Sequence, residues 1–148
     1  MREMMYALQF KGKAAPVPGS PNVVKAATTA PSCTITSNVG PQGVSGSLRP
    51  TAEGRASFES TVTRTGESTF QESGTISFGS GHRLRFTTVG QGYLGPSPQA
   101  GTMHGSVMWR VDGGEGQFDG ARGLITSNFT FTEAADVVDN HFGVLWVK

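Results

Sequence analysis

The sequence has a single cysteine, Cys33, among 148 residues, so no disulfide framework within the chain can support its fold. Only 16% of the residues are charged, the formal net charge is +1, and lysine and arginine form no run. No apolar run approaches the roughly 18 residues that span a membrane, and the N-terminus lacks the long apolar segment of a signal peptide. These absences predict a cytoplasmic protein that binds neither nucleic acid nor membrane.

Helical periodicity is missing too, because no extended window repeats apolar residues at helical intervals. The sequence has instead 21 glycines, nine phenylalanines and many threonines and valines, a composition typical of sheets joined by tight turns. A chain of this length fits one domain, residues 1–148, and buries roughly two-thirds of its unfolded surface.

Alternation of apolar and polar residues predicts short strands with one apolar face each. The last of them is unusual because it is apolar on both faces, so its outer face is covered either by another subunit or by the N-terminal segment. The predicted strands are residues 6–11, 23–29, 32–38, 58–63, 70–78, 82–87, 101–111, 124–132 and 137–147.

Proline and glycine mark the connections between these strands. Residues 14–22 contain Pro16, Pro18 and Pro21, which argue against a central strand or helix and predict a surface loop. The other predicted connections are turns at residues 40–43, 49–54, 65–67 and 79–81, a loop at 90–101 and a helical turn at 134–136.

Strands of this number and spacing form either a sandwich or a closed barrel. The glycines Gly74, Gly105 and Gly143 lie within strands, where a sheet must bend sharply to close. We therefore predict an all-β protein: a closed antiparallel β-barrel of about eight strands with little helix. In the glycine-rich stretch 113–123, Phe118 is expected to plug the barrel between two bends.

Several motifs point to chemistry that their context excludes. Residues 90–95 read G-x-G-x-x-G, but prolines follow where a dinucleotide site needs a helix. Residues 113–120 are rich in glycine but lack the Lys-Ser/Thr of a phosphate loop. The histidines His82, His104 and His141 show no metal-ligand spacing, and no serine lies in a nucleophile elbow. No metal or cofactor is expected.

Glu72 is the most informative polar residue because it falls on the apolar face of its strand, between Phe70 and Ile76. A carboxyl group there is either paired or has a raised pKa that suits acid–base catalysis. A bulge that turns Glu72 outward, or a structural hydrogen bond to the backbone, would explain the position equally well. Glu72 is therefore the one candidate catalytic residue.

The sequence allows two interpretations of Trp109 and two of the pair Asp139 and His141. Trp109 is either part of the core or the wall of a ligand cavity. Asp139 and His141 share one face of the last strand, where they form either an acid–base pair or a solvated pair.

Residues 105–111, followed by the glycine-rich stretch 113–123, resemble the allene oxide cyclase-like barrels, in which a strand, a G-x-G-x-F/L-x-G-x-x-G bend and two final strands follow one another. The resemblance implies an eight-stranded barrel of calycin-like shape that is often oligomeric. The group includes plant cyclases, which fold a fatty-acid epoxide in an apolar cavity with the help of a carboxylate, and uncharacterised bacterial barrels. Only Glu72 is a candidate for that carboxylate.

Three functions follow from this sequence: a barrel that binds a small apolar molecule, a cofactor-free isomerase or cyclase that uses Glu72, or a packed barrel that serves only in assembly. An interior void above roughly 300 Å³ would favour the first two. A homo-oligomer, either a dimer or a trimer, is expected. The residues predicted to line the interior and bind the ligand are Phe58, Phe70, Phe86, Val107, Trp109, Ile125 and Phe129.

Overall fold

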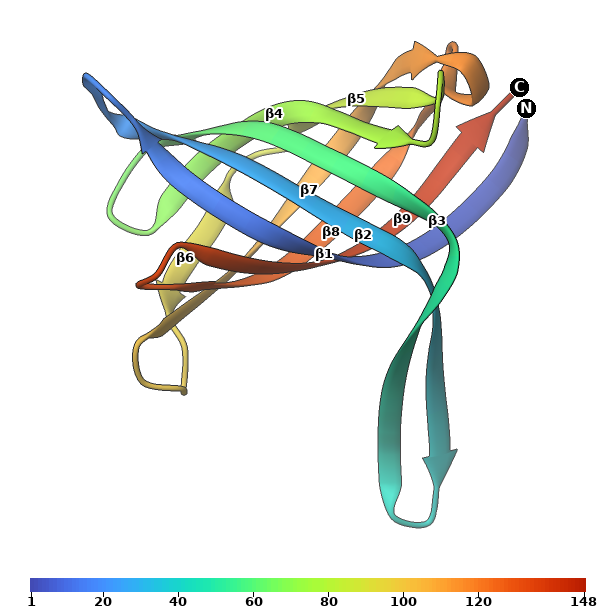
Figure 1. The fold of residues 1–148 in the computed structure, drawn as a ribbon, viewed down its shortest axis with the longest axis horizontal. Coiled ribbons are helices and arrows are strands. Elements are labelled where there is room, and N and C mark those ends of the chain that lie inside the picture. Colours follow the sequence, from blue (N-terminus) through green and yellow to red (C-terminus); the bar gives the residue numbers. More distant parts are fainter.

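A computed structural model describes all 148 residues and contains nine strands in one antiparallel sheet. Each strand pairs with its neighbours all the way round, and the pairings of β3 with β4 and of β6 with β7 complete the ring (Figure 1). The predicted closed antiparallel barrel is thus confirmed. The strands are β1 (Arg2–Val17), β2 (Ser20–Gly40), β3 (Gly43–Arg64), β4 (Thr69–Phe78), β5 (Arg83–Thr88), β6 (Gly92–Pro96), β7 (Thr102–Glu115), β8 (Arg122–Thr132) and β9 (Asp136–Val147).

The ring has eight positions because β5 and β6 share one of them. Both lie between β4 and β7, and β5 pairs with one half of each neighbour while β6 pairs with the other half. The first and last strands close the barrel along a continuous ladder that runs from Arg2–Val147 to Lys13–Asp136.

The two ends of the barrel differ. At one end, a single 3₁₀ turn, η1 (Gly116–Phe118), places Phe118 in the interior, where it is 1% exposed and packs on Phe78 at 5.2 Å between ring centroids. Both chain termini lie at this end, which we call the closed end (Figure 1). At the other end lie the turns that join β1 to β2, β3 to β4 and β8 to β9. We call it the open end.

Glycines let neighbouring strands approach closely where the wall bends. A side chain at Gly74 would overlap the carbonyl oxygen of Glu59 on β3, and one at Gly105 would overlap the carbonyl oxygen of Tyr93 on β6. At Gly143 a side chain is excluded by the ring of Tyr6, which packs directly over the backbone. No other residue type allows these contacts without a shift of the backbone or of the ring.

The predicted loop at residues 14–22 is wrong, because β1 runs on to Val17 and only a two-residue turn separates it from β2. Pro16 is tolerated because it lies where the β1–β2 ladder shifts register and ends. The helical turn predicted at 134–136 is also wrong: Ala135 has a φ of 67° and forms part of a tight turn.

Three predictions in the N-terminal third and the middle of the chain also need correction. Residues 23–29 and 32–38 belong to one long strand, β2, which shifts register between Pro31 and Cys33. The predicted turn at 49–54 is part of β3, and the predicted loop at 90–101 contains β6.

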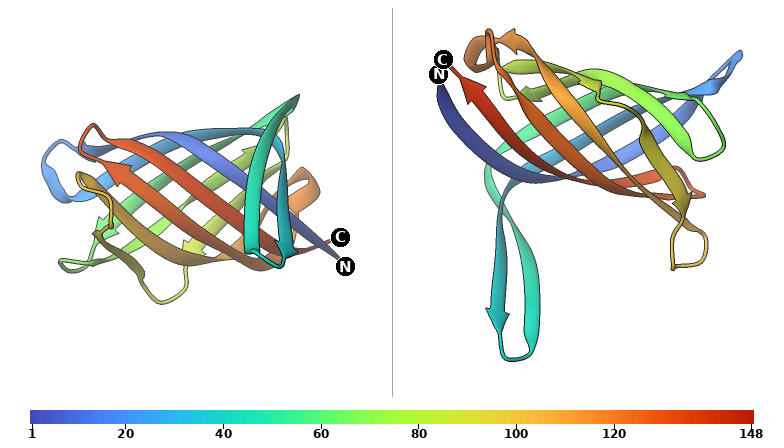
Figure 2. Two further views of the ribbon diagram at one scale, coloured as in Figure 1. Left: turned by 90° about the horizontal axis from the view of Figure 1, so that it is seen from below. Right: turned by 180° about the vertical axis from the view of Figure 1, so that it is seen from behind.

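Beyond Pro31, β2 and β3 leave the barrel together as a two-stranded ribbon, which we call the arm (residues 32–54). Figures 1 and 2 show it projecting away from the barrel wall. Most of its side chains are exposed. The structure contains no helix that is long and apolar enough to cross a membrane.

Candidate functional site

The barrel interior is filled at the closed end and hollow toward the open end. The hollow part is a cavity of about 140 Å³, lined mainly by apolar side chains from β2, β3, β4 and β8. Its mouth lies beside the β3–β4 turn, where Arg64 and Ser68 are exposed to solvent. The cavity is therefore open to solvent at one end and closed by the core at the other.

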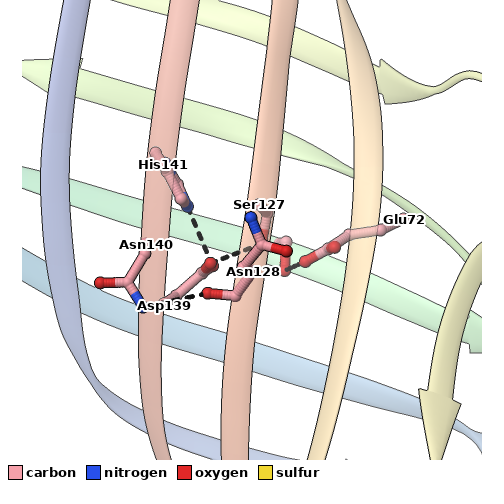
Figure 3. Close-up of polar contacts among 7 residues, drawn as sticks. Glu72, Ser127, Asn128, Asp139, Asn140 and His141 are labelled. Carbon is pink, nitrogen blue, oxygen red and sulfur yellow. Dashed lines mark hydrogen bonds and ion pairs between the residues drawn. The ribbon is translucent and has the colours of Figure 1, made fainter. Parts of the chain in front are cut away.

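Three buried polar side chains mark the inner end of the cavity: Thr28 from β2, Glu72 from β4 and Asp139 from β9. The Thr28 hydroxyl is buried and has no hydrogen-bond partner. In Figure 3, the carboxyl groups of Glu72 and Asp139 reach into the barrel from opposite walls. Three buried side chains that carry oxygen atoms thus lie in the wall of a cavity whose lining is mainly apolar.

Glu72 points inward, as the alternation of its strand predicts, and no bulge turns it out. Its Oε2 accepts a hydrogen bond from the Ser60 hydroxyl at 2.5 Å, across the β3–β4 ladder. Its backbone N–H donates to the Thr88 hydroxyl at 2.7 Å, which fixes the strand next to the carboxyl group. The carboxyl group therefore has one protein hydrogen-bond partner and no cationic one.

Burial raises the pKa of Glu72 to about 8, from an ordinary value of 4.5. The negative charge of Asp139 contributes to this rise, whereas the Ser60 hydrogen bond and the nearby Trp109 indole N–H oppose it. The Trp109 Nε1 atom is itself buried without an acceptor at hydrogen-bond geometry. Because burial dominates, Glu72 is mostly protonated and neutral at pH 7.

Asp139 is the centre of a second polar group. Its Oδ1 accepts from the Ser127 hydroxyl at 2.5 Å, and its Oδ2 lies 2.9 Å from the Nε2 atom of His141 (Figure 3). The pair that the sequence left open is thus buried rather than solvated, since both side chains are less than a tenth exposed.

The surroundings of His141 are aromatic. Its ring lies 4.4 Å from that of Phe10, 5.4 Å from Phe58 and 5.0 Å from Trp109, measured between centroids. The Asp139 carboxylate accepts a hydrogen bond from Nε2, so the imidazole N–H lies on Nε2. The other ring nitrogen, Nδ1, has no hydrogen-bond partner.

Ser127, Asp139 and His141 contain the residue types of a nucleophilic triad but not its connections. In such a triad the serine donates to the histidine, which accepts its proton. Here both the serine and the histidine contact the aspartate, and Ser127 is only 1% exposed. The three side chains therefore support the inner end of the cavity and do not activate a nucleophile.

The seven residues predicted to bind a ligand fall into two groups. Phe58, Phe70 and Phe129 line the cavity. The other four are packed in the core beneath it and are at most 5% exposed: Phe86, Val107, Trp109 and Ile125.

Sequence reasoning missed Thr28, because the strand register before residue 55 could not be assigned. It also missed Tyr6, whose hydroxyl is buried without a partner and whose pKa is raised by burial and by Asp139. Its inward orientation follows from the alternation of residues 6–11, but the pairing that buries it does not. The histidines His82 and His104 lie outside this site, and no group of metal-ligating residues large enough to hold an ion is formed.

Comparisons with protein-family models, with curated proteins and with solved structures found no match. The resemblance of residues 105–123 to the allene oxide cyclase-like barrels therefore stays a prediction.

Proposed function

We propose that the protein binds a small, mostly apolar molecule in the cavity at the open end of the barrel. The observation that carries the proposal is the lining: apolar side chains form the walls, and the buried polar ones gather at the inner end. Walls of this kind favour apolar ligands, and a few fixed polar groups orient them.

The size of the cavity narrows the class of ligand. At about 140 Å³ the cavity does not reach the roughly 300 Å³ expected above for a binding or catalytic barrel, but it is close to the engineered cavities of about 150 Å³ that hold benzene. A single ring or a short chain fits. A substrate as long as a fatty-acid epoxide does not, so cyclase chemistry on such a substrate is the weaker alternative.

Filling the cavity tests this proposal. Ala26 lines it from β2, so Ala26→Phe should occupy the space and weaken the binding of benzyl alcohol by at least roughly tenfold. The matched control is Ala27→Phe, one residue along β2, where the side chain is exposed on the outer face. Binding is measured by ligand-observed NMR, and folding of each variant by circular dichroism.

The proposal fails if the wild-type protein shows no saturable binding of benzyl alcohol, toluene or short aliphatic alcohols. It also fails if both phenylalanine variants bind benzyl alcohol as the wild type does.

A second candidate function, self-association, rests on two exposed apolar surfaces. The first is on the outer wall, where Val144 of β9 lies opposite Met5 of β1 and Leu124 of β8. Phe142 and Trp146 flank it on β9 and are half exposed. We call these five residues the outer patch. β1 pairs with β9 edge to edge, so the N-terminal segment does not cover the patch.

The second surface is one side of the arm. Cross-strand partners share a face, so the pairs Ile35–Leu48 and Val39–Val44 lie on the same side. The exposed fractions of Val39 and Val44 are 86% and 75%. The opposite side carries polar pairs, such as Asn38–Ser45, and the glycine pair Gly40–Gly43.

We propose that the partner is a second copy of the chain, whose arm lies on the outer patch while the first copy's arm lies on the second copy's patch. A two-fold axis satisfies both surfaces at once with one kind of contact. An isolated two-stranded ribbon is only marginally stable in water, so packing against a second copy would stabilise the arm. Patches of exposed apolar side chains commonly mark such interfaces.

Charge on the apolar side of the arm should separate the copies. We expect the wild-type protein to sediment as a dimer in analytical ultracentrifugation and the double variant Val39→Lys/Val44→Lys to sediment as a monomer. The control Asn38→Lys/Ser45→Lys places the same charges on the polar side and should remain dimeric. A wild-type protein that stays monomeric at high concentration would contradict the proposal.

A further inference from the structure

The inner end of the cavity has a chemical character that apolar binding alone does not use. We propose that the ligand is a small apolar amine, whose primary ammonium group lies among Thr28, Glu72 and Asp139. This inference rests on the ligand-binding function proposed above and specifies the ligand's polar group.

The first support is the kind of polar atoms present. Thr28, Glu72 and Asp139 offer oxygen acceptors from three different strands, and a primary ammonium group has three N–H donors. The Thr28 hydroxyl is unpartnered and its residue is only 3% exposed, so an acceptor is already placed in the cavity with no protein group to satisfy it.

The second support is the missing positive charge. Arg64 is the only cationic side chain that lines the cavity, and it is exposed at the mouth, where its guanidinium donates to the Glu67 carbonyl oxygen. Two carboxyl groups therefore share the inner end without a lysine or arginine. Asp139 has His141 beside it, but Glu72 has no basic partner, so a ligand ammonium would supply the counter-charge that a buried Glu72 carboxylate needs.

The third support is the shape of the cavity relative to these groups. The buried polar side chains are Thr28, Glu72 and Asp139, whereas Arg64 and Ser68 are exposed at the mouth and most of the remaining lining is apolar. A molecule with one charged end and an apolar body, such as benzylamine or hexylamine, satisfies both regions in a single orientation. A neutral hydrocarbon leaves the Thr28 hydroxyl unpartnered.

Binding of an ammonium group should be coupled to loss of a proton from Glu72. Asp139 on β9 is the charged group that acts on Glu72, and Arg64 lies at the mouth of the same cavity. Behind Asp139 are His141, which contacts it, and Tyr6, whose pKa it raises. Burial and Asp139 keep Glu72 protonated at pH 7 in the free protein. An adjacent positive charge favours the carboxylate, so the proton leaves as the ligand binds.

The experiment compares benzylamine with benzyl alcohol, its neutral analogue of nearly the same size. Isothermal titration calorimetry is run at pH 7 in buffers with different ionisation enthalpies, which reveals the protons released on binding. We expect benzylamine to bind at least roughly tenfold more tightly than benzyl alcohol and to release close to one proton per ligand, with none released by the alcohol.

Two variants assign the effect. Glu72→Gln should abolish the proton release and reduce the ratio of amine affinity to alcohol affinity by roughly tenfold. Glu59→Gln, on the outer face of β3, should behave as the wild type in every respect. A circular dichroism spectrum confirms that each variant is folded.

The outcomes separate the two proposals. Equal affinity for amine and alcohol, or amine binding without proton release, overturns the ammonium assignment and leaves apolar binding intact. Tight amine binding that Glu72→Gln does not alter also overturns it. Failure of both ligands to bind overturns the proposed function itself.

Discussion

Replacing Glu72 with glutamine is expected to raise the free energy of unfolding at pH 8 by about 4 kcal/mol and to leave it almost unchanged at pH 4. The reason is that the folded protein holds this carboxyl group in its neutral form, with a pKa of about 8. Glutamine has nearly the same shape, is neutral at every pH and offers the Ser60 hydroxyl an oxygen acceptor.

The direction of this change in the free energy of unfolding follows from whether Glu72 binds a proton in the folded and in the unfolded state. Below pH 4.5 Glu72 is protonated in both the folded and the unfolded chain, so its titration costs the folded state nothing. Between pH 4.5 and pH 8 the unfolded chain loses the proton and the folded one retains it. Stability is therefore lost as the pH rises through this window, and glutamine removes the loss.

Chemical denaturation of both proteins across pH 4–9 measures this difference directly. Glu59→Gln, where the carboxyl group is exposed on the outer wall, is the control and should follow the wild-type curve. A difference between wild type and Glu72→Gln that stays constant with pH would show that Glu72 titrates alike in both states.

Removing the carboxyl group of Asp139 should have an effect of similar size and opposite sign, a loss of about 3–5 kcal/mol in the free energy of unfolding on Asp139→Ala. The substitution leaves the Ser127 hydroxyl and His141 Nε2 in the core without their acceptor. Buried donors without partners each carry the cost of their lost hydration.

Asp136, three residues earlier on β9, provides the comparison. It also forms an ion pair, with Lys13 at 2.6 Å, but both side chains are more than half exposed. Asp136→Ala should therefore cost no more than about 1 kcal/mol. Urea unfolding midpoints of the two variants measure the difference, and equal losses would contradict a structural role for the buried pair.

The features that could be predicted are those determined by residues close together in the sequence. Alternation within residues 70–78 is enough to turn Glu72 inward, because side chains of a strand alternate between its faces. The glycines around Phe118 are enough to predict a bend with one buried aromatic. The barrel follows from many such strands and from glycines at their bends.

The parts that could not be predicted depend on which strands lie side by side. Ser60 reaches Glu72, and Ser127 reaches Asp139, only through cross-strand register. The burial of Asp139 was undecided because β9 is apolar on both faces, so its pattern does not say which face is inward. The arm was missed because its prolines read as breaks, although each strand of a free ribbon has an open edge where proline is tolerated.

The ladder between β1 and β9 has a consequence for how the chain folds. It joins Arg2 to Val147, so the barrel wall cannot be completed until nearly the whole chain is present. Pairings between residues so distant in the sequence form slowly, because the intervening chain must first lose its freedom. During synthesis, β1 therefore remains without its pairing to β9 until β9 has been made. Folding of this barrel should be a late and cooperative event, limited by the meeting of its two ends.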